Sequence, residues 1–208
     1  MMNLETLESA LAELGSLASA EGKVIDLAIY GGSALMLASN FRVATEDIDA
    51  VALDDQEIVN RLALGIANRR RWSPDWINDG VRTYLSPNVD GVAQHHELFR
   101  AYPSGPSPGL RVFVPTAEYI LAMKLMAMRI DDAGGKSDFP DIVNLLAVVG
   151  LTGPQDTLDF LGGFYPEARV SGRVLLGLRE IWRGKASIEQ ELAINAPQYL
   201  GRGGPTQK

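Results

Sequence analysis

The sequence contains no cysteine, which excludes disulfides and thiolate metal sites and fits a cytoplasmic location. It has no run of the ~18–20 apolar residues that a membrane-spanning helix needs. The N-terminal residues lack the basic and then apolar layout of a secretory signal. A net charge of −7 argues against broad nonspecific nucleic-acid binding, which depends on many lysine and arginine contacts to phosphate. We therefore expect no membrane partner, although a local basic patch could still bind RNA or a protein.

The composition that remains is typical of a globular protein with a good core. The 208 residues, 46% of them hydrophobic, predict one domain or one domain with a small helical appendage. We expect an α/β (α+β) fold, with a small mixed sheet flanked by helices, over residues 1–150. A helical C-terminal extension is expected at 151–200 and a disordered tail at 201–208.

The hydrophobic periodicity predicts individual elements along the chain. The predicted strands are 24–30, a strand that contains Asp47 and Asp49, 81–85 and 110–114, with an irregular loop at 86–109. The predicted helices are 4–20, one that opens at Ser33, 55–70, 116–130, one capped by Ser137, 154–161 and 166–183.

Asp47 and Asp49 form the most informative pair in the chain. In an extended strand, residues i and i+2 point to the same face, so the two carboxylates stand side by side while Ile48 and Ala50 face the core. Such carboxylates repel each other unless a cation lies between them, and Mg²⁺ (or Mn²⁺) is the usual occupant where phosphates supply other ligands. The alternative is two solvent-facing aspartates near the end of an edge strand.

A glycine-rich turn precedes this pair. The apolar strand predicted at 24–30 ends at Gly31 and Gly32, and a helix follows from Ser33. Paired glycines let a backbone approach a ligand closely, and a helix N-terminus attracts phosphate. The turn therefore predicts a phosphate site beside the predicted metal site. In the simpler interpretation, Ser33 only caps the helix.

In order and spacing, this turn followed by Arg42 and the Asp47-Ile48-Asp49 strand resembles the nucleotidyltransferase superfamily. The similarity is greatest to its minimal bacterial branches, which include the AbiEii/AbiGii-type toxin nucleotidyltransferases. A second match lies downstream, where a helix carries Lys124 and the next helix opens with Asp138 and Asp141. The resemblance spans roughly residues 24 to 150.

The resemblance implies Mg²⁺-dependent transfer of a nucleoside monophosphate from a nucleoside triphosphate to a hydroxyl on RNA, such as tRNA, or on a protein. It also implies a possible cognate toxin or antitoxin partner. The implied nucleotide-binding residues are Gly31, Gly32, Ser33, Arg42, Lys124 and Asp138. The implied metal ligands are Asp47 and Asp49. The implied catalytic residues are Asp47, Asp49, Lys124 and Asp141.

Several of these residues have simpler interpretations. Lys124 could extend its stem to the surface instead of facing phosphate. Asp138 and Asp141 could be first-turn acids favoured by the helix dipole, and if one is functional we favour Asp141. Arg42 could clamp phosphate or pair with an acid.

One departure from the superfamily pattern supports a second function. Superfamily members typically carry a third carboxylate on a neighbouring strand, but the strands predicted at 81–85 and 110–114 contain none. Asp79 and Asp90 lie only near strand ends. The alternative function is therefore a non-catalytic nucleotide-binding or protein-binding module. A phosphohydrolase is less favoured, because no histidine or further acid cluster accompanies the pair.

Two other groups carry weaker signals. His95 and His96 are the only histidines and have only Glu97 nearby, so we expect no histidine metal site. The run Arg69-Arg70-Arg71, followed by Trp72 and Trp76, could contact RNA, but such runs are more often solvated helix ends.

Overall fold

The computed structural model describes residues 1–129, 138–192 and 198–199. It confirms a mixed α/β fold of the α+β class with a small mixed sheet. The described chain divides into two compact units. The first comprises Met1–Thr83 and Gly91–Thr116, and the second Tyr84–Asp90 and Ala117–Tyr199. The domain boundary that the sequence placed near residue 150 stays a prediction.

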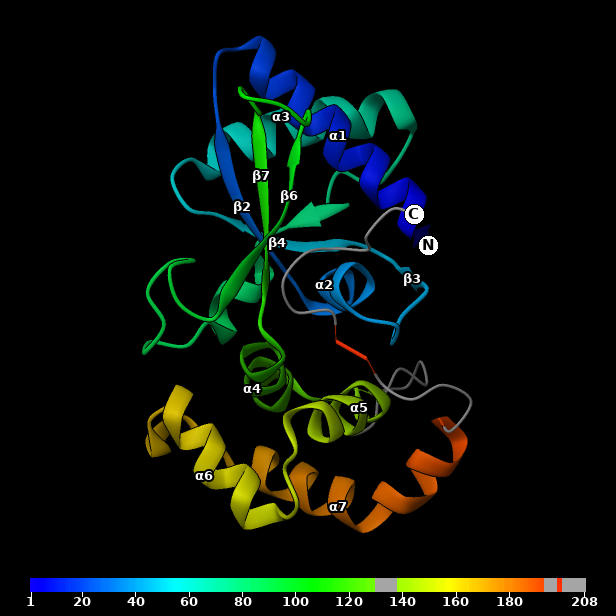
Figure 1. The fold of residues 1–208 in the computed structure, drawn as a ribbon, viewed down its shortest axis with the longest axis vertical. Helices are drawn as coiled ribbons and strands as arrows, with labels where there is room; N and C mark the ends of the chain where they lie inside the picture. Colours follow the sequence, from blue (N-terminus) through cyan, green and yellow to red (C-terminus); the bar gives the residue numbers. More distant parts are fainter. Residues whose placement is uncertain (130–137, 193–197, 200–208) are drawn as a thin grey trace. The chain divides into compact units, whose positions relative to one another are not determined.

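A five-stranded sheet forms the centre of the first unit (Figure 1). Its order is β5-β4-β2-β7-β6, in which β2 runs parallel to β7 and antiparallel to β4, β5 is parallel to β4 and β6 is antiparallel to β7. A two-stranded sheet pairs β1 with β3. The strand bounds are β1 Met2–Asn3, β2 Ile25–Tyr30, β3 Ala44–Thr45, β4 Ile48–Ala52, β5 Ile77–Asn78, β6 His96–Tyr102 and β7 Leu110–Pro115.

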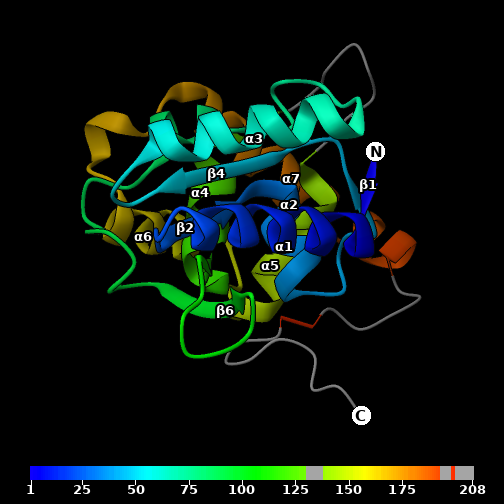
Figure 2. The same cartoon turned by 90° about the horizontal axis from the view of Figure 1, so that it is seen from above.

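Two amphipathic helices cover one face of this sheet. Helix α1 spans Leu4–Ala20 and buries Leu7, Leu11 and Leu14 completely, as its sequence spacing predicted. Helix α3 spans Gln56–Arg70, close to the predicted 55–70, with Asp55 as its N-cap. The two helices lie side by side (Figure 2), α1 against β6 and β7 and α3 against β4 and β5.

The opposite face of the sheet carries the polar residues of interest. Leu27 and Ile29 are fully buried on the helix-covered face, so Tyr30 points the other way. Tyr30 is in register with Asp49, and Asp49 is in register with Asn78. These three side chains therefore share one face at one end of the sheet, where helix α2 (Gly31–Ala38) begins directly after β2.

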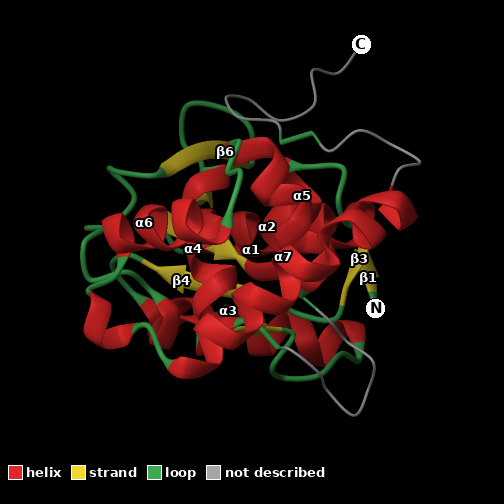
Figure 3. Ribbon diagram, turned by 90° about the horizontal axis from the view of Figure 1, so that it is seen from below, coloured by secondary structure: helices red, strands yellow, loops and turns green. Residues whose placement is uncertain are grey.

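The second unit is helical (Figures 1 and 3). Its helices are α4 Ala117–Ala127, α5 Phe139–Val149, α6 Pro154–Phe164 and α7 Gly172–Leu192, with a short 3₁₀ helix at Glu167–Arg169. Tyr119 on α4 is almost fully buried, stacks on Phe164 and accepts a hydrogen bond from the Ser86 backbone at 3.1 Å. No described helix is long and apolar enough to cross a membrane.

Two predicted elements are wrong. Residues 81–85 do not form a strand: Gly80–Tyr84 is a 3₁₀ helix in which the Arg82 amide donates to the Asp79 carbonyl at 3.0 Å. Its side chains are mostly exposed, so it has no apolar face to bury in a sheet. The loop predicted at 86–109 contains β6, whose alternation is broken by a β-bulge between Leu98 and Arg100.

The short strands β1, β3 and β5 were not predicted, and the other differences concern helix ends. Helix α4 ends at Ala127, not at residue 130. Ser137, Gly134 and Gly135 lie outside the described residues, as does the predicted tail at 201–208, and Asp138 holds the N-cap position of α5. The helix expected from Pro166 begins only at Gly172, because the 3₁₀ turn comes first.

Candidate functional site

The alternation predicted around the carboxylate pair is present. Ile48 and Ala50 are fully buried, whereas Asp47 and Asp49 are both half-buried. Asp47 lies just before β4, and Asp49 is the second residue of that strand. The two carboxylates therefore stand at the beginning of β4, two residues apart.

The glycine turn lies against this pair. Gly31 has a φ of +61°, in the left-handed region that favours glycine, and it is the first residue of α2. A Cβ at Gly31 would overlap the Asp49 carboxylate, so the absence of a side chain is what lets Asp49 reach the turn. The N-terminus of an eight-residue helix and a carboxylate thus lie in direct contact.

Ser33 and Arg42 also lie at this turn. Ser33 is 1% exposed, and its hydroxyl donates to the Asp47 carbonyl at 3.1 Å, so it joins the turn to the carboxylate segment. A Cβ built on Gly32 would lie 3.7 Å from the Arg42 guanidinium, which places Arg42 over the turn. The predicted residues of the first unit are therefore gathered at one place, and contact of Ser33 or Arg42 with phosphate stays a prediction.

Further hydrogen bonds hold Asp47. The Thr45 hydroxyl donates to the same Asp47 carbonyl at 3.0 Å. The Asn78 amide donates to the Asp47 carboxylate at 3.2 Å. Asp47 is thus held through its backbone and through its side chain.

Sequence reasoning missed a tyrosine–histidine pair on the same face. The Tyr30 hydroxyl and His96 Nε2 lie 3.0 Å apart, with their rings edge to face. His96 Nδ1 lies 2.9 Å from the Gln94 carbonyl, which can only accept, so Nδ1 carries the proton and Nε2 accepts from Tyr30. Burial lowers the pKa of His96, which favours this neutral form. Because Tyr30 directly precedes Gly31, this hydrogen bond fixes the residue from which the glycine turn begins.

The other predicted residues form a buried ionic cluster in the second unit. Lys124 is 9% exposed, so it does not extend to the surface, and its ammonium lies 3.0 Å from Asp138 and 2.7 Å from Asp141. Arg129 also binds Asp138, from its Nε at 3.1 Å. Burial alone would raise the pKa of Asp138, but the Lys124 charge and the hydrogen bonds from Arg129 outweigh burial and lower the pKa to about 2. Lys124 therefore lies between the two acids, and the roles of all three residues in catalysis or nucleotide binding stay predictions.

The carboxylates of Asp47 and Asp49 fit a hard divalent cation that takes only some of its ligands from the protein. No group of three histidine or acidic side chains that could hold a metal occurs among the described residues. Asp79 and Glu97 do not join Asp47 and Asp49 in such a group. Asp79 pairs with Arg82 at 2.8 Å, and Glu97 lies on the helix-covered face, in register with Val114. Two carboxylates alone suit Mg²⁺, which usually keeps several waters and takes other oxygen ligands from phosphates.

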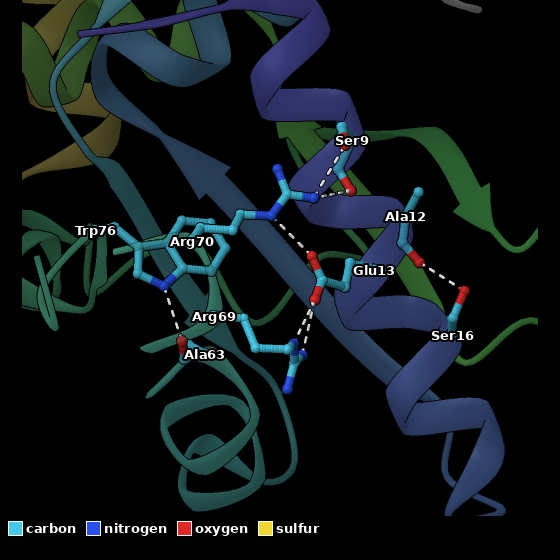
Figure 4. Close-up of polar contacts among 8 residues, drawn as sticks. All are labelled: Ser9, Ala12, Glu13, Ser16, Ala63, Arg69, Arg70 and Trp76. Atoms are coloured by element: carbon cyan, nitrogen blue, oxygen red, sulfur yellow. Dashed lines mark hydrogen bonds and ion pairs between the residues drawn. The ribbon is translucent and has the colours of Figure 1, made fainter. Parts of the chain in front are cut away.

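The arginine run is engaged within the protein (Figure 4). Arg69 and Arg70 bind Glu13 of α1 at 2.7 Å and 2.8 Å. The Arg70 guanidinium also lies 4.9 Å above the Trp72 ring. These contacts favour the helix-end interpretation over an RNA patch, because two of the three guanidinium groups already bind Glu13 within the protein.

A surface cavity of about 290 Å³ lies elsewhere on the first unit, where β2 begins. Its lining includes Lys23, Asp26, Asp54 and Ile58 but none of the predicted site residues.

No family model, curated protein or solved structure matches the chain.

Proposed function

We propose that the protein is a Mg²⁺-dependent nucleotidyltransferase that moves a nucleoside monophosphate from a triphosphate to a hydroxyl on RNA or on a protein. The observation that carries the proposal is the contact between the Asp49 carboxylate and Gly31 at the N-terminus of α2. A helix N-terminus attracts anions, but a carboxylate beside it repels phosphate. A divalent cation between carboxylate and phosphate removes this conflict.

The proposed roles follow from the placement of the residues. Asp47 and Asp49 would hold Mg²⁺, which would stabilise the charge on the phosphate chain during in-line displacement. The backbone of Gly31 and Gly32 would receive the β and γ phosphates, with Arg42 above them. The acceptor hydroxyl would lose its proton to solvent as its oxygen forms a bond to the α phosphorus. The bond from that phosphorus to the bridging oxygen would break, and pyrophosphate would leave.

The assay that tests transfer uses α-³²P-labelled nucleoside triphosphates. Purified protein is incubated with each one and Mg²⁺, with and without total tRNA and cell lysate. We expect label on RNA or protein with the intact chain and none with the Asp47→Ala/Asp49→Ala double variant. Label that persists in the double variant would contradict the proposal.

A second candidate is a non-catalytic nucleotide-binding or protein-binding module, such as one member of a toxin–antitoxin pair. It is favoured by one specific observation, the absence of a third acidic or histidine ligand beside the pair within the described residues. This alternative predicts Mg²⁺-dependent triphosphate binding, or a protein partner, with no transfer of label.

A further inference from the structure

Asn78 occupies a position next to the carboxylate pair to which sequence reasoning gave no role. It is in register with Asp49 on the parallel neighbour β5, so the two side chains share a face. Strand β5 is only two residues long, but Ile77 is buried beside Ile48, and the Ile48 amide donates to the Trp76 carbonyl at 2.8 Å. The Trp76 indole in turn donates to the Ala63 carbonyl of α3 at 3.0 Å (Figure 4), which fixes the start of β5.

The orientation of the Asn78 amide is determined by its two partners. Its Oδ1 accepts from the Gly80 amide at 3.0 Å, and its Nδ2 donates to Asp47 Oδ2 at 3.2 Å. A flipped amide would set its oxygen against the Asp47 carboxylate and its NH₂ against the Gly80 N–H, so only the observed orientation forms both bonds.

This arrangement completes the support of Asp47. Ser33 and Thr45 fix its carbonyl, and Asn78 fixes the rotation of its carboxylate through one oxygen. A lysine or arginine at position 78 would bind the carboxylate through a full positive charge and would compete with a cation. A neutral amide orients the carboxylate without that competition.

We propose that Asn78 is the positioning residue that holds the Asp47 carboxylate ready for a divalent cation shared with Asp49. This inference rests on the proposed function, since it concerns the same site. Partners that orient metal-binding side chains typically contribute about 10–100-fold to metal affinity.

The test is a titration of the intact chain with Mn²⁺ in the absence of nucleotide. Electron paramagnetic resonance measures the free ion, so no activity readout is needed. Asn78→Ala removes both hydrogen bonds, and Asn78→Asp keeps the acceptor for Gly80 while replacing the donor with a carboxylate. Asn60→Ala, at an exposed asparagine of α3, is the matched control.

We expect Asn78→Ala to weaken Mn²⁺ binding about 10–100-fold. Asn78→Asp should bind Mn²⁺ at least as tightly as the wild type, because it adds a third carboxylate, but should melt at a lower temperature in EDTA because that carboxylate repels Asp47. Asn60→Ala should be unchanged. A purely structural role would lower the melting temperature of both Asn78 variants and leave the Mn²⁺ affinity of Asn78→Ala unchanged.

The outcomes separate the inference from the function. If the wild type binds Mn²⁺ in a manner that requires Asp47 and Asp49, but both Asn78 variants bind with unchanged affinity, the positioning role is overturned and the metal site stands. If the wild type and the Asp47→Ala/Asp49→Ala variant bind Mn²⁺ equally poorly, both the proposed function and this inference fail. If Asn78→Ala does not fold, the melting temperature of Asn78→Asp in EDTA decides: a value equal to that of the wild type overturns the role, because residue 78 would then not act on the Asp47 carboxylate.

Discussion

Lys124 gives the sharpest test of the second unit. Its side chain is 10% exposed, and its ammonium lies between the carboxylates of Asp138 and Asp141, whose side chains are 8% and 6% exposed. The variant Lys124→Met keeps the apolar stem in α4 but removes the charge. Asp138 keeps its bonds to Arg129, whereas Asp141 loses the ammonium at 2.7 Å.

The expected cost follows from the burial of the cluster. Removing one partner of a buried ion pair costs about 3–5 kcal/mol, because the desolvated charge that stays behind loses the attraction of that partner. We therefore expect Lys124→Met to lower the free energy of unfolding by that amount, measured by urea denaturation followed by circular dichroism. An exposed pair provides the matched control: Arg183→Met breaks a contact with Glu180 within α7, and its cost should stay below about 1 kcal/mol.

The partner acid supplies a second check on the same reasoning. Adding Asp141→Asn to Lys124→Met neutralises the carboxylate that was left behind. The double variant should therefore be more stable than the sum of the two single changes predicts, by about 1–3 kcal/mol. A loss below about 1 kcal/mol for Lys124→Met, or strictly additive effects, would refute the argument that this buried ammonium holds the cluster together.

Three further predictions concern other parts of the structure. Gly31→Ala should abolish Mg²⁺-dependent triphosphate binding in a calorimetric titration, because its Cβ would displace Asp49. Gly22→Ala is the control, because Gly22 has a similar φ of +67° but open space around it. That variant carries the same backbone strain and should bind triphosphate normally. The lowered pKa of Asp138 predicts that stability is fully present above pH about 4 and falls toward pH 2, by at most about 2 kcal/mol, and urea titrations should show this slope vanish in Asp138→Asn. The lowered pKa of His96 predicts a loss of stability as the pH falls below about 6.5, because the unfolded chain takes up the proton first; a slope in thermal melts that His96→Gln leaves unchanged would contradict it.

Local patterns sufficed where an element's own residues determine it. The leucine spacing of α1, the Asp55 cap of α3 and the alternation of Ile48 and Ala50 with two aspartates were all readable from the sequence. The same is true of the contact between the glycine turn and the carboxylate pair, since both lie within one strand–helix–strand unit.

Non-local pairing accounts for what the sequence could not predict. Strand β6 exists because it pairs with β7, and its bulge hides the alternation that would have indicated a strand. His96 meets Tyr30 across 66 residues of sequence, and Asn78 reaches Asp47 across 31, from a strand too short to leave a periodic signal. Residues 81–85 have strand-like composition but no buried face, so backbone turns determine their structure.

The proposed function requires the glycine turn and the two aspartates together to bind a metal–triphosphate complex. Calorimetric titration of the intact chain with each nucleoside triphosphate, in Mg²⁺ and in EDTA, tests this with the wild type and with Asp49→Asn. We expect binding of at least one triphosphate in Mg²⁺ that is lost in EDTA and in the variant. Binding of equal affinity in all three conditions, or no binding of any triphosphate by the wild type, would contradict it.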